Sequence, residues 1–167
     1  MMMETVETNI EELLKELGEK LPRFPDGRID YSNSDRAPVL TCFVKFEDRI
    51  LPLKRSDRVR THQRKWNAVV GYIDESKPLR QKALEELGEE IGVSEKEILQ
   101  FKMGSSYEFF DQDSKRSWLV HLMLAELKNT PDIKLDWEHT DFKWITLGDL
   151  KDYDMVPKLE ESLKRVL

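Results

Sequence analysis

Apolar residues recur along this chain with two periods, one typical of helices and one typical of strands. Apolar side chains return every three or four positions over residues 4–21, 78–91 and 156–167, which predicts three amphipathic helices. Between them lie short apolar runs bounded by turn-forming residues, which are typical of strands. The predicted strands are Val39–Phe46, Arg49–Arg55, Trp66–Ile73, Glu97–Met103, Tyr107–Phe110, Ser117–Leu127 and Phe142–Thr146.

The order of these elements favours an α/β fold. Segment 117–127 (SWLVHLMLAEL) is apolar at both alternating sets of positions, so we predict a central strand that is buried on both faces. Strands that alternate with helices around such a strand indicate a mixed sheet between helical layers, an α/β/α sandwich. Residues 1–37 are predicted to form an extra N-terminal helix and a proline-containing connector, ahead of a domain at 38–167. We expect the extra helix to pack across this domain; the alternative is a contact in a homodimer.

The composition of the chain limits the classes of protein to which it can belong. The chain has 167 residues, 39% hydrophobic and 36% charged, which suits one soluble globular domain. It lacks the long apolar run of a membrane-spanning helix, and its acidic N-terminus does not resemble a signal peptide. With a single cysteine, Cys42, no internal disulfide can form, so we expect a cytoplasmic protein. The net charge of -6 argues against binding of nucleic-acid polymers, while a small anionic ligand at a local basic patch stays compatible with it.

Four glutamates occur within six residues of the second predicted helix, at positions 85, 86, 89 and 90. Like charges at helical spacing cost about 0.2–0.5 kcal/mol per pair, and no lysine or arginine lies among them. Glu86 and Glu90 flank one edge of the core-facing stripe, and Glu89 comes next around the helix. Divalent cations such as Mg²⁺ prefer oxygen-rich sites of this kind, so we predict a metal site; the alternative is a solvated acidic helix.

The segment from Gly71 to Val93 resembles the sequence box of the Nudix hydrolases. That box is a glycine, five residues, a glutamate, seven residues, Arg-Glu, an aliphatic residue, any residue, Glu-Glu, any residue, a glycine and an aliphatic residue. Two positions depart, because Lys77 stands where the family has glutamate and Glu85 where it has arginine. Since the departures exchange an acid and a base, we hypothesise that the two side chains pair with each other. The matching positions are Gly71, Glu86, Leu87, Glu89, Glu90, Gly92 and Val93.

The resemblance implies a Nudix fold and a metal-dependent hydrolase that cleaves a diphosphate linkage in a nucleoside diphosphate derivative or a similar small molecule. It implies that Gly71, Glu86, Glu89 and Glu90 form the site that holds Mg²⁺ or Mn²⁺. Glu138, upstream of the last predicted strand, or Glu89 would accept the proton of the attacking water. For Glu138 the alternative is a carboxylate on a surface turn. For the whole protein the alternative is a catalytically weak or inactive domain that binds a nucleotide or a partner.

A basic segment, residues 54–65, precedes the box in this otherwise acidic chain. We expect Arg55, Arg58, Arg60 and Arg64 to bind the phosphates of the substrate that do not react, because a guanidinium can bond two phosphate oxygens at once. The alternative is a solvated basic loop. Trp66, which follows, either stacks on a base or belongs to the core. Cys42, within an apolar strand, is expected to be a small core residue rather than a nucleophile.

Overall fold

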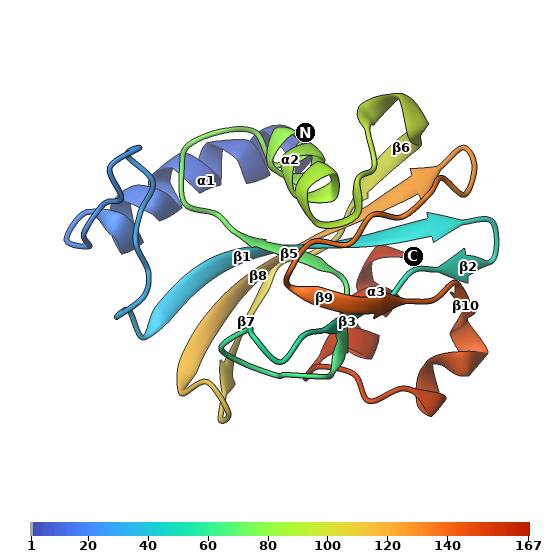
Figure 1. The fold of residues 1–167 in the computed structure, drawn as a ribbon. Coiled ribbons are helices and arrows are strands. Elements are labelled where there is room, and N and C mark those ends of the chain that lie inside the picture. The colour runs from blue at the N-terminus through green and yellow to red at the C-terminus, as the bar shows by residue number, and fades with distance from the viewer. Residues whose placement is uncertain (1) are drawn as a thin grey trace.

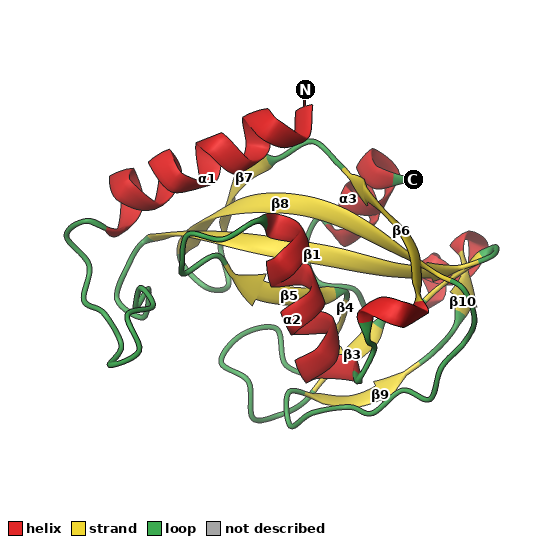
Figure 2. Ribbon diagram, turned by 90° about the horizontal axis from the view of Figure 1, so that it is seen from above, coloured by secondary structure: helices red, strands yellow, loops and turns green. Residues whose placement is uncertain are grey.

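The computed structural model describes the backbone of residues 2–167 and the side chains of residues 10–167. Figures 1 and 2 show a twisted mixed sheet with helices on both faces. Helices α1 (Met2–Gly18) and α2 (Leu79–Ile91) pack on one face, and α3 (Leu159–Val166) packs on the other. The predicted α/β/α arrangement, with the additional N-terminal helix, is therefore confirmed.

The main sheet is organised around two long parallel strands, β1 (Arg36–Phe46) and β8 (Arg116–Leu127), paired from Arg36 opposite Ser117 to Lys45 opposite Glu126. β8 is most buried in its second half, and its first four residues are half-buried, so the prediction of a strand buried on both faces holds for that second half. The other strands of this sheet run antiparallel to their neighbours: β2 (Arg49–Ile50) and β5 (Val69–Tyr72) beside β1, β6 (Ile98–Met103) and β7 (Tyr107–Asp111) beside β8, and β10 (Ile145–Thr146) beside β2.

Three predicted strands are each divided in two. The predicted strand 49–55 breaks at Pro52, which has no N–H to donate to a ladder, and the chain then leaves the main sheet. The predicted strands 66–73 and 142–146 divide in the same way, because one half of each pairs outside the main sheet. These halves form a second, three-stranded sheet of β4 (Trp66–Asn67), β3 (Leu53–Arg55) and β9 (His139–Phe142).

The N-terminal helix packs on the domain within the single chain. Ile10 and Leu14 are buried in the core cluster that also contains the apolar face of α2, while the predicted apolar residue Val6 lies outside the described side chains. The connector then crosses the segment between β5 and α2, where the Tyr31 hydroxyl donates to the Ile73 carbonyl at 2.8 Å. This agrees with the expectation of packing across the domain.

Two short 3₁₀ helices, η1 (Glu95–Glu97) and η2 (Leu147–Asp152), complete the elements that the structure describes. Across the described residues, no helix has the length and apolar content that a membrane crossing requires.

Candidate functional site

Helix α2 begins and ends where its sequence indicates. Pro78 is the N-cap, and Gly92 adopts the left-handed conformation with φ of 72°, which only glycine takes without strain. The helix buries an apolar stripe of Leu79, Ala83, Leu87 and Ile91, and on the same buried side two charged residues, Lys82 and Glu90. Buried charges need partners, so these two mark the functional side of the helix.

Glu90 is a buried carboxylate with an unsatisfied oxygen. The residue is 2% exposed, and its Oε2 has no hydrogen-bond partner among the described residues. Its Oε1 lies 3.7 Å from Nε2 of His139, whose Nδ1 is 3.1 Å from an oxygen of Asp136. Burial, followed by the neighbouring Glu86 carboxylate, raises the pKa of Glu90 well above its usual value. A buried oxygen without a donor is suited to a cation, which makes this atom the strongest sign of a metal site.

Glu86 lies beside Gly71 of β5 and is engaged by a lysine. Lys82 Nζ lies 3.1 Å from Glu86 Oε1 and 3.4 Å from Asp74 Oδ1. The charges of Glu86 and Asp74 keep the pKa of Lys82 raised although burial, the largest single influence, lowers it. The ammonium is therefore charged and held between two carboxylates at one end of the site.

Glu89 is exposed at the surface of α2, and desolvation followed by the charge of Glu86 raises its pKa. Within residues 10–167, the only three acidic or histidine side chains whose ligand atoms all lie within 4.8 Å are His62, Asp111 and Asp113. The carboxylates of Glu86, Glu89 and Glu90 thus lie on one side of α2, but their ligand atoms do not all lie within 4.8 Å of one another. This looser arrangement suits a cation that keeps several of its waters.

The predicted pairing of Lys77 with Glu85 is confirmed as a contact. Lys77 Nζ donates to both oxygens of Glu85, at 2.8 and 3.0 Å, and also lies 2.8 Å from Glu75. The pair connects the segment before α2 to the middle of the helix, close to Glu86. The two residues that depart from the box thus form an ion pair with each other.

A cavity of about 600 Å³ opens beside Glu86 and Glu89, within the size range of small-molecule sites, and Glu90 lies outside its lining. One part of its wall is charged, with Glu86 and Glu89 from α2 and arginines from the loop that follows β3. The other part is apolar and lies over the sheet face that α3 covers. It is lined by Val39, Val70, Tyr72, Tyr107, Phe109, Trp118, Val120, Val156, Pro157 and Leu159.

Glu138 lines the cavity together with Glu86 and Glu89. Burial, then the charges of Asp136 and Glu86, raises the pKa of Glu138 to about 7. Its backbone carbonyl accepts a hydrogen bond from the Ser56 N–H at 2.7 Å, which joins its loop to the segment after β3. Glu138 is thus half-buried, and a carboxylate with a pKa near neutrality is suited to accept a proton.

The basic loop contributes three of its four predicted arginines to the cavity. Arg58 and Arg60 line it, and within residues 10–167 neither makes a salt bridge. Arg55 also lines it, but its guanidinium donates twice to the Thr61 carbonyl, at 3.1 and 2.9 Å, and so holds the loop in shape. Arg64 does not line the cavity: its side chain is 74% exposed and pairs with Asp57 at 2.8 Å.

Two further side chains have the environment of core residues. Trp66 is buried with its ring edge-on to Tyr153 at 5.1 Å between centroids, and it does not line the cavity. The prediction of Trp66 as a ligand-stacking residue is therefore wrong, because β4 pairs with β3 and turns the indole into the core. Cys42 is buried in β1, and burial raises its pKa to about 12, which agrees with a core residue.

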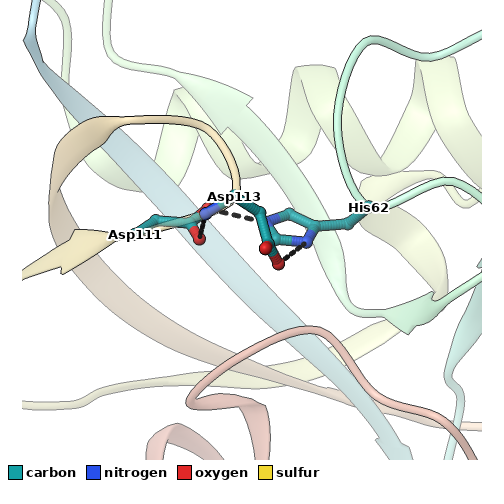
Figure 3. Close-up of side chains that lie close together, drawn as sticks. All are labelled: His62, Asp111 and Asp113. Carbon is teal, nitrogen blue, oxygen red and sulfur yellow. Dashed lines mark hydrogen bonds and ion pairs between the residues drawn. The ribbon is translucent and has the colours of Figure 1, made fainter.

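The same loop is joined to β7 by a histidine between two carboxylates. Nε2 of His62 lies 2.6 Å from Asp111 Oδ2, and its Nδ1 lies 3.6 Å from Asp113 Oδ2. Figure 3 shows that the two carboxylates face different nitrogens of the ring. Since an ion takes one nitrogen of an imidazole, this arrangement suits a hydrogen-bonded anchor of the loop better than a metal site. His62 and Asp111 are 49 positions apart, and no pattern in the sequence predicts their contact.

Sequence reasoning also missed the polar residues that surround the glutamates. Arg28, from the connector, reaches the cavity and lies 3.6 Å from Asp74. Lys82 lies four positions before Glu86, so the helical spacing alone predicts a contact between these two side chains. His139 and Arg28 are brought to the site only by the packing of distant segments.

We compared the chain with known protein families, curated proteins and solved structures. A model of the NUDIX domain matches residues 35–166. Among curated proteins, no sequence matches the chain significantly. The fold is similar to that of a MutT protein from Methanosarcina mazei, with 18% identity, a TM-score of 0.66, and coverage of 80% of this chain and 94% of that chain.

Two other solved structures are similar at the same level. The NUDIX domain of Shewanella oneidensis NrtR, a complex with ADP ribose, has 16% identity and a TM-score of 0.66 over 78% of this chain and 85% of that chain. A bifunctional NMN adenylyltransferase/ADP ribose pyrophosphatase from Francisella tularensis has 20% identity and a TM-score of 0.67 over 95% of this chain and 45% of that chain.

Proposed function

Because the chain belongs to the NUDIX domain family, we propose that it is a hydrolase that cleaves a diphosphate linkage in a small molecule with the help of a divalent cation. The observation that carries this proposal is the buried, unpartnered Oε2 of Glu90 on the side of α2 that also carries Glu86 and Glu89. A carboxylate kept in this state is costly unless a cation or a proton neutralises it.

The residues present fit a divalent cation. Glu90 supplies the buried oxygen and Glu89 an exposed one, and Glu86, which Lys82 engages, adds negative charge beside them. Oxygen donors favour Mg²⁺ or Mn²⁺ over softer metals. When bound, such an ion would neutralise phosphate oxygens and lower the pKa of an attacking water.

Other residues of the cavity accept a proton and bind the substrate. Glu138 accepts the proton of the attacking water, since its pKa of about 7 makes it partly ionised and sufficiently basic at neutral pH. Arg58 and Arg60 bind the phosphate that does not react. The apolar wall around Tyr72 and Trp118 takes the uncharged part of the substrate, so a nucleoside diphosphate derivative fits the division of the cavity.

The similar structures suggest which compounds to test. One is a complex with ADP ribose, one is an ADP ribose pyrophosphatase complexed with AMP and a manganese ion, and one is a Caenorhabditis elegans Ap4A hydrolase. ADP-ribose, Ap4A and nucleoside triphosphates are therefore incubated with the protein in Mg²⁺, Mn²⁺ or EDTA, and products are followed by ³¹P NMR. We expect at least one compound to be cleaved at a P–O–P linkage with metal and not in EDTA.

A domain that binds a nucleotide without turnover is the second candidate, favoured by the inverted Lys77–Glu85 pair and by Lys82 inside the carboxylate group. Calorimetry on the same panel separates the two functions. Binding of ADP-ribose or Ap4A without cleavage in any metal would contradict the hydrolase and support the binding domain.

A further inference from the structure

Lys82 is an unusual residue for the buried side of a helix. It is 7% exposed, although lysine loses strongly favourable hydration when it is buried. Its ammonium lies at the wall of the cavity, 3.1 Å from Glu86 and 3.4 Å from Asp74. Both carboxylate partners also line the cavity, so this ion pair belongs to the site rather than to the core behind it.

The ammonium divides the carboxylates into two groups. Asp74 and Glu86 already have cationic partners: Lys82 contacts both, and Arg28 adds a second contact to Asp74 at 3.6 Å. Glu89 makes no salt bridge within residues 10–167, and Glu90 retains an oxygen with no partner there. The salt bridges of Lys82 and Arg28 are thus made to Asp74 and Glu86, while the charges of both cations reach Glu89 without a salt bridge.

A divalent ion cannot share Glu86 freely with this lysine. Ion and ammonium would bind the same carboxylate, and at about 2.1 Å from its oxygen the ion would lie close enough to be strongly repelled. Within residues 10–167 the ammonium makes no salt bridge with Glu89 or Glu90, so the unpartnered Oε2 of Glu90 and the exposed Glu89 carboxylate are the oxygens that it leaves open to an ion.

We propose that the Lys82 ammonium is a fixed internal cation of this site, which occupies the Asp74 and Glu86 end and confines exchangeable divalent ions to the Glu89 and Glu90 end. The proposal rests on the proposed function in so far as that function requires ion binding. It has two consequences: the chain binds fewer ions than its carboxylates would allow, and it folds without metal because Lys82 neutralises part of the buried charge.

Mn²⁺ binding to the full chain tests this directly, because the free ion has an EPR signal that disappears on binding. The parent is compared with Lys82→Met, which keeps the apolar stem and removes the charge. The matched control is Arg80→Met, which removes one positive charge from the same helix, where Arg80 pairs with Glu95 at the surface, 2.9 Å away. We expect Lys82→Met to bind one additional ion, or the same ion roughly tenfold more tightly or better, and Arg80→Met to bind as the parent does.

Lys82→Met leaves Asp74 and Glu86 without their shared partner, so a second comparison protects the test against loss of folding. Lys82→Met in an Asp74→Asn background is compared with Asp74→Asn alone, and the lysine change should again strengthen Mn²⁺ binding. Mn²⁺ should also raise the melting temperature of Lys82→Met by more than that of the parent.

Two outcomes would overturn the inference: equal Mn²⁺ binding by the parent and both lysine variants, or weaker binding without the lysine, which would make Lys82 a residue that positions Glu86. Failure of the parent itself to bind Mn²⁺ is a separate result, because it would contradict the proposed function as well.

Discussion

The backbone of Gly71 lies directly against the carboxylate of Glu86. A Cβ atom added at Gly71 would stand 2.6 Å from Glu86 Oε1, closer than side-chain carbons approach oxygens in proteins. Strand β5 therefore presents a glycine at the one place where the glutamate of α2 needs room. The sequence resemblance suggested Gly71 for its place beside the metal, and the structure gives it this steric role.

Gly71→Ala should displace the Glu86 side chain and disturb its contact with Lys82. We expect a loss of turnover of at least about tenfold, since displacement of a catalytic group by an ångström has effects of that order or larger. Gly88→Ala on the exposed side of α2 is the control: its Cβ meets nothing closer than 3.9 Å, and it should gain about 0.5–1 kcal/mol of stability with unchanged kinetics. Parental activity in Gly71→Ala would remove the steric role.

Lys77 and Glu85 are predicted to act as a unit. Lys77→Glu places a third carboxylate between Glu75 and Glu85, and Glu85→Arg places two cations together, so each should lower activity and stability. The double variant restores an ion pair of opposite polarity and should recover part of both losses. Urea unfolding and kinetics of all four proteins give the coupling, which we expect at about 0.5–1 kcal/mol. Arg80–Glu95, an exposed pair between α2 and η1, serves as the control, since its reversal should leave kinetics unchanged.

Much of this arrangement was predictable because it is local. The limits of α2 follow from Pro78 and Gly92, and the contact of Lys77 with Glu85 joins residues only eight positions apart. The break of the predicted strand at Pro52 is local as well, because proline has no N–H to donate to a ladder. Its consequence, a second sheet with β9, was not predictable, since that pairing is decided by a strand far along the chain.

Glu138 should control the pH dependence of the reaction. Its pKa of about 7 means that the ionised form needed to accept a proton grows as pH rises through neutrality, so kcat/KM should rise there. Glu138→Gln should lose about 10²- to 10⁴-fold in kcat and should also lose this rise. A variant that retains the parental pH profile would show that another group accepts the proton.

The same shift predicts a change in stability with pH. The pKa of Glu138 is raised from 4.5 to about 7 on folding, so the folded state holds this proton more tightly than the unfolded state. The resulting stabilisation is complete below pH 4.5 and is lost as pH rises to about 7. Glu138→Gln cannot titrate, so without metal it should equal the parent near pH 4 and exceed it at pH 8. Urea unfolding at the two pH values measures this difference, and a constant difference between the proteins would contradict the assignment.

Arg58 and Arg60 should bind substrate, and Arg64 should not. Arg58→Ala or Arg60→Ala should raise KM and weaken its dependence on ionic strength, because fewer charges then remain to be screened. Arg64→Ala is the matched control on the same loop, because its guanidinium is exposed and paired with Asp57. An effect of equal size in all three variants would indicate a general charge effect instead of direct phosphate contacts.

The sequence alone does not predict which of these arginines line the cavity. All four predicted arginines belong to the basic segment 54–65, and their spacing does not separate those that line the cavity from Arg64, which does not. The separation depends on how the loop is held, by Arg55 on Thr61 and by His62 on Asp111. Contacts of this kind join segments that no periodicity connects, and the same holds for Arg28 and Asp74.

The most direct test of the central claim is a Mn²⁺ titration in which EPR occupancy and hydrolysis of the best substrate are measured on the same samples, for the parent and for Glu90→Gln. We expect turnover in the parent to rise in proportion to bound Mn²⁺. Glu90→Gln should lose both and melt at a higher temperature than the metal-free parent, since it no longer buries a carboxylate whose Oε2 has no partner among the described residues. Parental Mn²⁺ binding and turnover in Glu90→Gln would contradict the claim that this side of α2 holds the catalytic ion.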